Sequence, residues 1–107
     1  MEIRFAKSFY VQFDLLVMHF APYYPANKAA ENILKTINDF AEQVNSHPES
    51  CPLSPHLVSL GFNAYREFNK GHIKIIYKIN KQYIDVLLIC SEKQDLEKLI
   101  VNYCLIK

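Results

Sequence analysis

Positively charged side chains recur along one stretch of the sequence, AYREFNKGHIKIIYKINKQYIDVLLI at residues 64–89. Arg66, Lys74 and Lys78 lie on two strand-like runs that we expect to meet in a turn at residues 69–71. Side chains of this kind bind phosphate groups and acidic protein surfaces. They also have a plainer use, because lysines keep an open sheet face soluble and an arginine pairs with a carboxylate elsewhere in the fold. Both interpretations stay open for these three residues.

Other residue types that commonly carry chemistry lack the spacing that the chemistry requires. The four histidines do not have the spacing of metal ligands, and His19 lies among apolar residues of an expected helix. None of the serines lies in a nucleophile-elbow context. With only Gly61 and Gly71 in the chain, no glycine-rich phosphate loop exists. The sequence therefore predicts no metal site, no cofactor and no hydrolase triad.

Composition places the chain among small globular proteins. Half of its 107 residues are hydrophobic and the formal net charge is +1, so we expect one domain over residues 1–107 with one modest core. The three cysteines are widely spaced without a Cys-x-x-Cys pair, which favours a reducing compartment. The N-terminal MEIRFAKSFY carries charge where a secretory signal is apolar, and no apolar segment approaches the roughly 20 residues of a membrane span. We therefore expect a cytoplasmic protein that does not enter the membrane.

Two helices joined by a short proline-containing connection are predicted after an opening strand, EIRFA. From residue 7 or 8 onward, apolar residues recur at intervals of three and four. These residues are Phe9, Phe13, Leu16 and Phe20. A second apolar stripe runs along residues 25–48, where Glu31 and Lys35 have the i,i+4 spacing of an ion pair. We expect the two helices to pack as an antiparallel hairpin.

Three strands and a final helix are predicted in the second half. The segment ESCPLSPHLVSLGFN, residues 49–63, has the prolines and glycine of a loop. In the second of the three strands, isoleucines and a tyrosine at alternate positions share one face, and Lys74 and Lys78 share the other. The third strand, YIDVLLIC, is apolar on both faces and is therefore expected at the centre of the sheet. Helical spacing resumes in residues 93–107.

The predicted fold class is α+β, with the order β-α-α-β-β-β(-α). Short loops between the last three strands make them antiparallel neighbours. We expect an antiparallel twisted sheet with the N-terminal helical hairpin packed on one face. The opposite face should then be open and carry Arg66 together with Lys74.

The order of these elements resembles the RelE/ParE superfamily of toxins from type II toxin–antitoxin pairs of bacteria. Residues 25–48 are similar to the ParE-type pattern of a proline, a small residue, spaced aliphatics and a second proline. The stretch YREFNKGHIKIIYKINKQYIDVLLI resembles the family segment in which an arginine precedes a turn, a basic-aliphatic strand and a final apolar strand. SEKQDLEKL, residues 91–99, stands where many relatives carry a histidine or basic residue followed by Arg-Asp. The resemblance covers nearly the whole chain and is closer to the ParE-like, or plasmid stabilization, branch.

The resemblance implies one of two mechanisms. RelE-like members cut messenger RNA in the ribosomal A site, with clustered basic residues and a proton-transfer group. ParE-like members inhibit DNA gyrase, and both types are neutralised by an antitoxin whose tail wraps the toxin. On the nuclease branch, the catalytic candidates that match family positions would be Arg66, Lys74, Lys93 and Tyr103. Ser91 and Gln94 stand where histidine and arginine are common, and Leu99 occupies the usual aromatic position, so the pattern disfavours RNA cleavage.

The resulting prediction is a ParE-like toxin that inhibits DNA gyrase by protein–protein contact and is neutralised by a cognate antitoxin in a toxin–antitoxin hetero-oligomer. The residues predicted to contact the target are Arg66, Lys74 and Lys78. The residues predicted to contact the antitoxin, from the apolar excess of the last helix, are Leu96, Leu99, Ile100 and Tyr103. Two alternatives stay open: a ribosome-dependent mRNA endonuclease, and an inactive homologue that retains only antitoxin binding.

Overall fold

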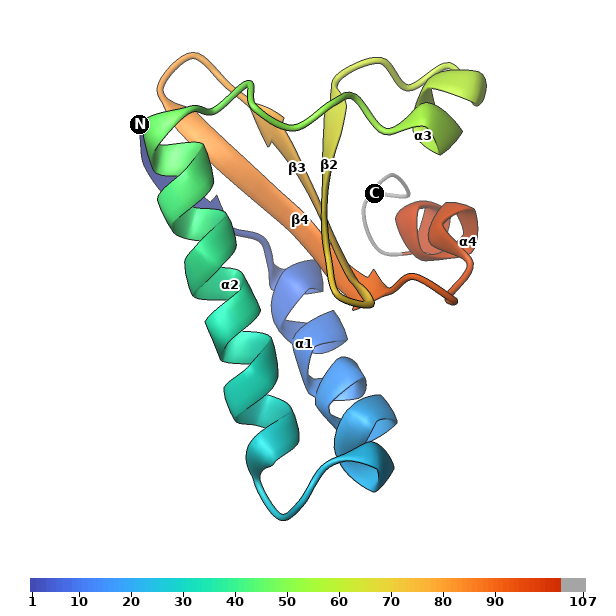
Figure 1. Ribbon diagram of the computed structural model, residues 1–107. Helices are drawn as coiled ribbons and strands as arrows, with labels where there is room; N and C mark the ends of the chain where they lie inside the picture. Colours follow the sequence, from blue (N-terminus) through green and yellow to red (C-terminus); the bar gives the residue numbers. More distant parts are fainter. Residues whose placement is uncertain (103–107) are drawn as a thin grey trace.

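The computed structural model describes residues 1–102, so the predicted site residue Tyr103 lies outside the described residues. Its elements follow the predicted order, with one added short helix (Figure 1). They are β1 (Glu2–Phe5), α1 (Lys7–Phe20), the 3-10 turn η1 (Ala21–Tyr23), α2 (Lys28–Ser46), α3 (Pro55–Ser59), β2 (Tyr65–Lys70), β3 (Ile73–Ile79), β4 (Tyr83–Ser91) and α4 (Leu96–Ile100).

The four strands form one mixed sheet in the order β1-β4-β3-β2. The prediction of an α+β fold is confirmed, as are the antiparallel pairing of β2, β3 and β4 and the central position of β4. The expectation of a wholly antiparallel sheet is wrong, because β1 pairs with β4 in parallel. A short turn between two strands makes them antiparallel, but β1 and β4 are separated by the helical hairpin, β2 and β3. Their relative direction is therefore not fixed by a turn, and they pair in parallel.

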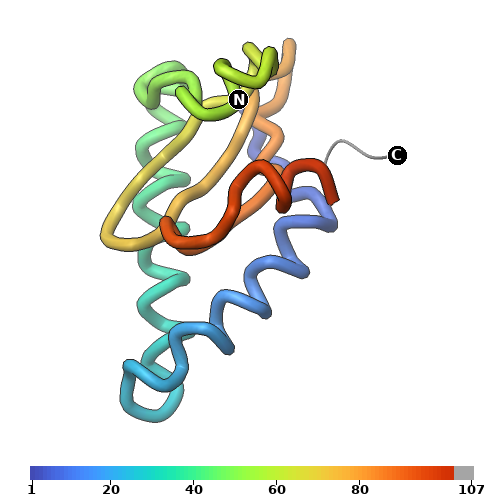
Figure 2. The backbone as a smooth tube through the Cα atoms, turned by 90° about the vertical axis from the view of Figure 1, so that its right-hand side faces the viewer, coloured from blue at the N-terminus to red at the C-terminus, as the bar shows by residue number. Residues whose placement is uncertain are grey.

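The helical hairpin covers one face of the sheet, as predicted (Figure 2). Phe9 and Leu16 of α1 and Phe40 of α2 are buried in the core that these helices share with β2, β3 and β4. The ring of Phe40 lies 5.3 Å, centroid to centroid, from both Phe68 of β2 and Tyr77 of β3. The odd-numbered residues of β3 therefore point toward the helices, which confirms the predicted division of that strand into two faces.

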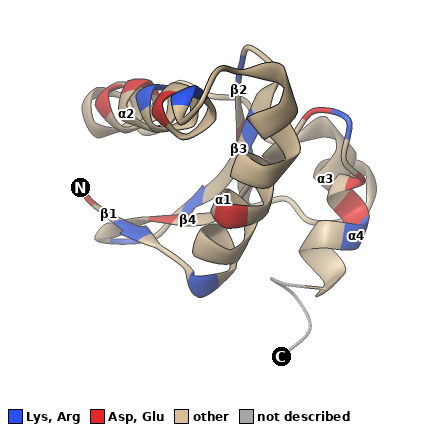
Figure 3. Cartoon of the chain, turned by 90° about the horizontal axis from the view of Figure 1, so that it is seen from below, with Lys and Arg blue, Asp and Glu red and all other residues tan. Residues whose placement is uncertain are grey.

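The second face of the sheet is not fully open. Figure 3 shows α3 and α4 on the side opposite to α2. Leu57 of α3 and Leu96 and Ile100 of α4 bury Ile76 and Leu88 of the sheet in a second apolar core. The segment that the sequence indicated as loop contains α3, which begins where the Ser54 side chain accepts a hydrogen bond from the backbone N–H of Leu57. Serine at the N-cap and proline at the first position are favourable for a helix start.

The turn between β2 and β3 is centred between Gly71 and His72, later in the chain than its predicted centre at Lys70. Lys70 pairs with Ile73, which leaves Gly71 and His72 as a two-residue connection in place of the expected turn at residues 69–71. Gly71 has φ +62°, and glycine at the first central position is typical of a type II′ hairpin turn. Since side chains alternate between faces along a strand, this change of register moves the side chains of β2 relative to those of β3.

Candidate functional site

Arg66 lies on the face of the sheet that the helical hairpin covers. It pairs in register with Tyr77, which is buried beneath α2. The half-buried Arg66 side chain donates from Nη1 to the backbone carbonyl of Cys51 at 2.6 Å and to that of Glu49 at 3.4 Å. The guanidinium therefore holds the loop after α2 against the edge of β2. It uses backbone carbonyls for this, whereas the sequence suggested a carboxylate partner.

Lys74 lies on the opposite face, within a nearly buried polar cluster. Its Nζ is 3.6 Å from Oε2 of Glu67, and the side chains of the two residues are 20% and 10% exposed. The Glu67 carboxylate also accepts a hydrogen bond from Ser54 Oγ at 2.8 Å and one from Asn69 Nδ2 at 2.9 Å. We call Ser54, Glu67, Asn69 and Lys74 the Glu67 cluster. It joins the start of α3 to β2 and β3, so the Lys74 ammonium is used within the fold.

A buried thiol lies beside this cluster. Cys90 of β4 is the cross-strand partner of Lys74. Burial raises the pKa of the Cys90 thiol to about 11; the nearby Lys74 charge opposes this effect and the Glu67 charge adds to it. The thiol is therefore protonated at neutral pH and is a poor nucleophile.

The expectation that Arg66 and Lys74 share an open face is wrong. Their side chains point to opposite sides of the sheet, because β2 continues to Lys70 before it turns. A three-residue turn at 69–71 would have made Arg66 and Lys74 direct cross-strand partners. In the observed register the two cations cannot hold one phosphate group between them.

Lys78 belongs to a different arrangement, a row of side chains that crosses all four strands on the second face. Tyr65, Lys78, Asp85 and Arg4 are consecutive register partners on β2, β3, β4 and β1. The Lys78 ammonium lies 5.9 Å from the centroid of the Tyr65 ring. We call these four residues the cross-strand row.

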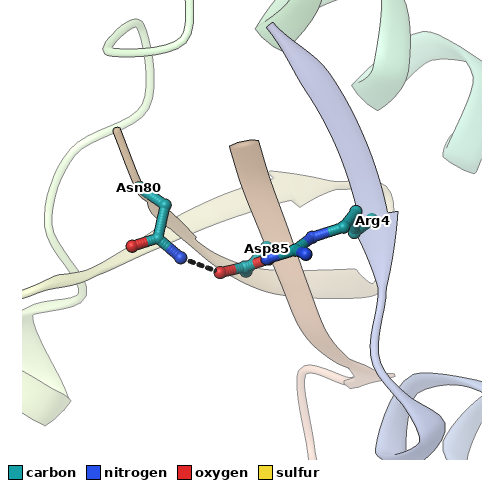
Figure 4. Close-up of polar contacts among 3 residues, drawn as sticks. All are labelled: Arg4, Asn80 and Asp85. Atoms are coloured by element: carbon teal, nitrogen blue, oxygen red, sulfur yellow. Dashed lines mark hydrogen bonds and ion pairs between the residues drawn. The ribbon is translucent and has the colours of Figure 1, made fainter. Parts of the chain in front are cut away.

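Arg4 and Asp85 of this row are hydrogen-bonded to each other (Figure 4). Arg4 donates from Nε at 3.2 Å and from Nη2 at 3.1 Å to Oδ1 of Asp85, and Asn80 Nδ2 donates to the other carboxylate oxygen. The Arg4 guanidinium also lies 3.6 Å from the centroid of the Tyr83 ring. The Arg4 side chain is 49% exposed, so the row presents an oriented cation to solvent. Sequence reasoning missed this site, because local patterns do not reveal the parallel pairing of β1 with β4.

Lys93 lies in the turn between β4 and α4. The Ser91 backbone N–H donates to Oε1 of Gln94 at 2.8 Å, and the Lys93 backbone N–H donates to Ser91 Oγ at 3.2 Å, so these two residues shape the turn. The Lys93 side chain is exposed and has no carboxylate within 4.0 Å among residues 1–102. It lines a hollow with aromatic residues at the end of α1, and neither Arg66 nor Lys74 lines that hollow.

The predicted antitoxin contacts on α4 are largely used by the protein's own core. Leu96 is 6% exposed and Ile100 is fully buried, and both pack against the sheet. Leu99 is half-buried at the margin of the same core. Leu96 and Ile100 therefore serve the protein's own core, because α4 packs against a sheet face that the sequence suggested was open, whereas the neighbouring Val101 is 37% exposed.

An exposed apolar row lies instead on the outer side of α1. Val11, Leu15 and Met18 are 46%, 45% and 70% exposed. Their spacing of four and three residues places them on one face of the helix, opposite the face that carries Phe9 and Leu16. The sequence shows the same spacing, so this second apolar face can be read from it beside the phenylalanine stripe.

Comparisons with known proteins do not identify a family: no protein-family model matches the sequence, and no curated protein matches it. Within residues 1–102, no group of three or more His, Cys, Asp or Glu side chains is arranged to hold a metal ion. A membrane-spanning helix is likewise not found in that part of the chain.

Proposed function

We propose that this chain is the toxin of a type II toxin–antitoxin pair, that it inhibits DNA gyrase by protein–protein contact as ParE-like toxins do, and that a cognate antitoxin neutralises it. The support is the resemblance of residues 25–48 and 65–89 to that superfamily, together with a helical hairpin that packs on one face of the sheet.

The separation of Arg66 from Lys74 counts against RNA cleavage, and it also leaves Lys78 as the one predicted target contact that does not hold the fold together. A phosphoryl-transfer site needs cations that converge on one group, where charge develops in the transition state. Arg66 instead binds two backbone carbonyls, and Lys74 lies against Glu67 on the other face. Two of the three basic residues that the nuclease branch requires, Arg66 and Lys74, are therefore used within the fold, and Lys93 lies apart from both of them.

Two exposed features would serve the two partners of such a toxin. The cross-strand row presents Lys78, together with Arg4 in its pair with Asp85, on the second face of the sheet, and its net positive charge suits an acidic patch on the target. The apolar row of Val11, Leu15 and Met18 on α1 suits an amphipathic helix of an antitoxin. We therefore assign the antitoxin contact to α1 and not, as the sequence predicted, to α4.

The test is a supercoiling assay with purified gyrase, run beside a translation extract in which messenger RNA cuts are mapped. We expect the wild-type protein to inhibit supercoiling and to leave the messenger intact. Lys78→Glu should weaken inhibition about tenfold by reversing a contact charge. Lys81→Glu, an exposed lysine in the β3–β4 turn, is the matched control and should leave inhibition unchanged. Intact supercoiling with a cut messenger would reverse the proposal in favour of the nuclease, and no effect in either assay would favour the inactive homologue.

A further inference from the structure

A groove lies where the end of the helical hairpin passes the β2–β3 turn. One hollow of about 350 Å³ is lined by Phe20 at the end of α1, by Tyr24 after η1, by Lys35 of α2 and by His72 of the turn. An adjoining hollow of about 400 Å³ shares Phe20, Tyr24 and His72 and adds Lys93. We call the combined hollow the tip groove. Figure 1 shows that the β2–β3 turn lies at the end of the sheet from which the two helices extend.

The carboxylates in the tip groove are already paired. Asp39 of α2 lies 2.6 Å from the ammonium of Lys70, and Glu92 lies 2.7 Å from Nδ1 of His72. Both pairs connect separate elements and hold the walls of the groove together. The Asp39 charge is offset by that of Lys70, whereas Glu92 is paired with a histidine ring that is charged only if it is protonated.

Two lysines at the groove have no such partner. The predicted pair of Glu31 with Lys35 does not form, because Glu31 lies 3.0 Å from Lys28 instead. Lys35 and Lys93 are exposed, and within residues 1–102 neither has a carboxylate at 4.0 Å or less. The groove therefore carries a local excess of positive charge in a chain whose formal net charge is +1.

Aromatic rings supply the apolar part of the same groove. The rings of Phe20 and Tyr24 lie 6.4 Å apart, and the Tyr24 hydroxyl accepts a hydrogen bond from Asn32 Nδ2 at 3.1 Å. Tyr23 lines the adjoining hollow and is 78% exposed. Exposed tyrosines are frequent contact residues at protein interfaces, because a ring buries a large area with few rotatable bonds.

We propose that the tip groove binds an acidic segment of a partner protein, whose carboxylates meet Lys35 and Lys93 and whose apolar side chains pack on Tyr23 and Tyr24. Charge complementarity selects this occupant. A nucleic acid fits less well, since its affinity grows with the number of phosphates that basic side chains neutralise, and the described part of the groove offers two unpaired lysines in a chain of formal net charge +1. The inference stands on the groove alone and does not depend on gyrase as the target.

The test begins with selection of binders from a random-peptide display library against the full chain. We expect the selected peptides to be enriched in Asp and Glu next to apolar residues. Binding of the synthesised peptides, measured by fluorescence anisotropy, should weaken about tenfold in Lys35→Glu and in Lys93→Glu. Lys81→Glu is the control and should bind like the wild type. Far-UV circular dichroism of each variant verifies that the fold is retained, which the exposure of all three lysines favours.

A charge exchange makes the test specific. Peptides resynthesised with lysine in place of their acidic residues should bind the double variant Lys35→Glu/Lys93→Glu and not the wild type. The proposal is overturned by three results: no selected binders, binders without an acidic excess, or binders that the two substitutions do not affect. Fluorescein-labelled single-stranded RNA is measured in parallel, and RNA that binds more tightly than every peptide and depends on the same lysines would also overturn it. The gyrase assay can fail while these peptides still bind, so the two proposals are tested separately.

Discussion

Replacing Lys74 by methionine and Glu67 by glutamine, singly and together, tests whether the Lys74 charge belongs to the fold. Both replacements keep side chains of similar length, so they remove charge without opening a large cavity. The two groups are 3.6 Å apart, and their side chains are 20% and 10% exposed. If the pair stabilises the fold, either single change leaves the other charge nearly buried without its partner.

The expected magnitude follows from that geometry. At an effective dielectric constant of about 20, opposite unit charges at this separation attract each other by about 4–5 kcal/mol. Much of this is cancelled by the cost of taking both groups out of water. We therefore expect Lys74→Met to lower the free energy of unfolding by about 2 kcal/mol, and the double variant to lose about 1–2 kcal/mol less than the sum of the two single variants.

The assay is urea unfolding followed by far-UV circular dichroism, where a change of about 2 kcal/mol moves the midpoint by about 1 M. Glu67→Gln should show a smaller loss than Lys74→Met, because the amide oxygen still accepts a hydrogen bond from Ser54. Single variants that each lose less than about 0.5 kcal/mol, with additive effects in the double variant, would refute the reasoning. Lys74 would then be an ordinary solvated lysine, available to bind a target.

Three further predictions concern the fold around the site. Arg66→Ala should lower the free energy of unfolding by about 1–2 kcal/mol through loss of its bonds to the Cys51 and Glu49 carbonyls, and an unchanged urea midpoint would contradict it. Gly71→Ala should cost about 1 kcal/mol in the same assay, because φ is +62° there while the space around its Cα is open. For Cys90, folding raises the thiol pKa from 9.0 to about 11, so the native state stays protonated to higher pH than the unfolded state. The free energy of unfolding therefore falls as the pH rises above 9.0. At about pH 10 the wild type should have lost about 1.4 kcal/mol of its free energy of unfolding through this thiol. The Cys90→Ala variant lacks the thiol, so its free energy of unfolding should fall by about 1.4 kcal/mol less than that of the wild type between about pH 8 and pH 10. Parallel curves of unfolding free energy against pH would contradict the prediction.

The spacing of apolar residues along the sequence predicted most of the helices and strands. The helical stripes of residues 7–20 and 25–48 and the alternation along Ile73–Ile79 come from residues that must face a core, so the pattern and the structure have the same cause. The short helix α3 was missed within a segment rich in prolines. Ser54 followed by Pro55 is the sequence signal for the start of a helix, because serine caps the first turn and proline fits its first position.

The candidate site was less predictable, since it depends on register and on distant pairing. A turn placed at residues 69–71 puts Arg66 opposite Lys74, whereas the two-residue turn at Gly71 and His72 puts them on opposite faces. Turn propensity alone did not separate the two registers, since lysine and asparagine before a glycine are acceptable in either. The contact of Arg4 with Asp85 joins residues 81 positions apart, and no local pattern encodes it.

Gyrase inhibition by the folded Lys74→Met/Glu67→Gln double variant tests the central claim most directly, namely that the protein acts by contact and uses Lys74 only to hold its fold. The measurement is the concentration of protein that halves supercoiling, with the wild type in the same assay. The two concentrations should agree within about twofold, a difference of less than 0.5 kcal/mol in binding free energy by the usual conversion. A loss of inhibition of about tenfold or more, in a double variant that circular dichroism shows to be folded, would contradict the claim and place the Lys74–Glu67 pair in the functional surface.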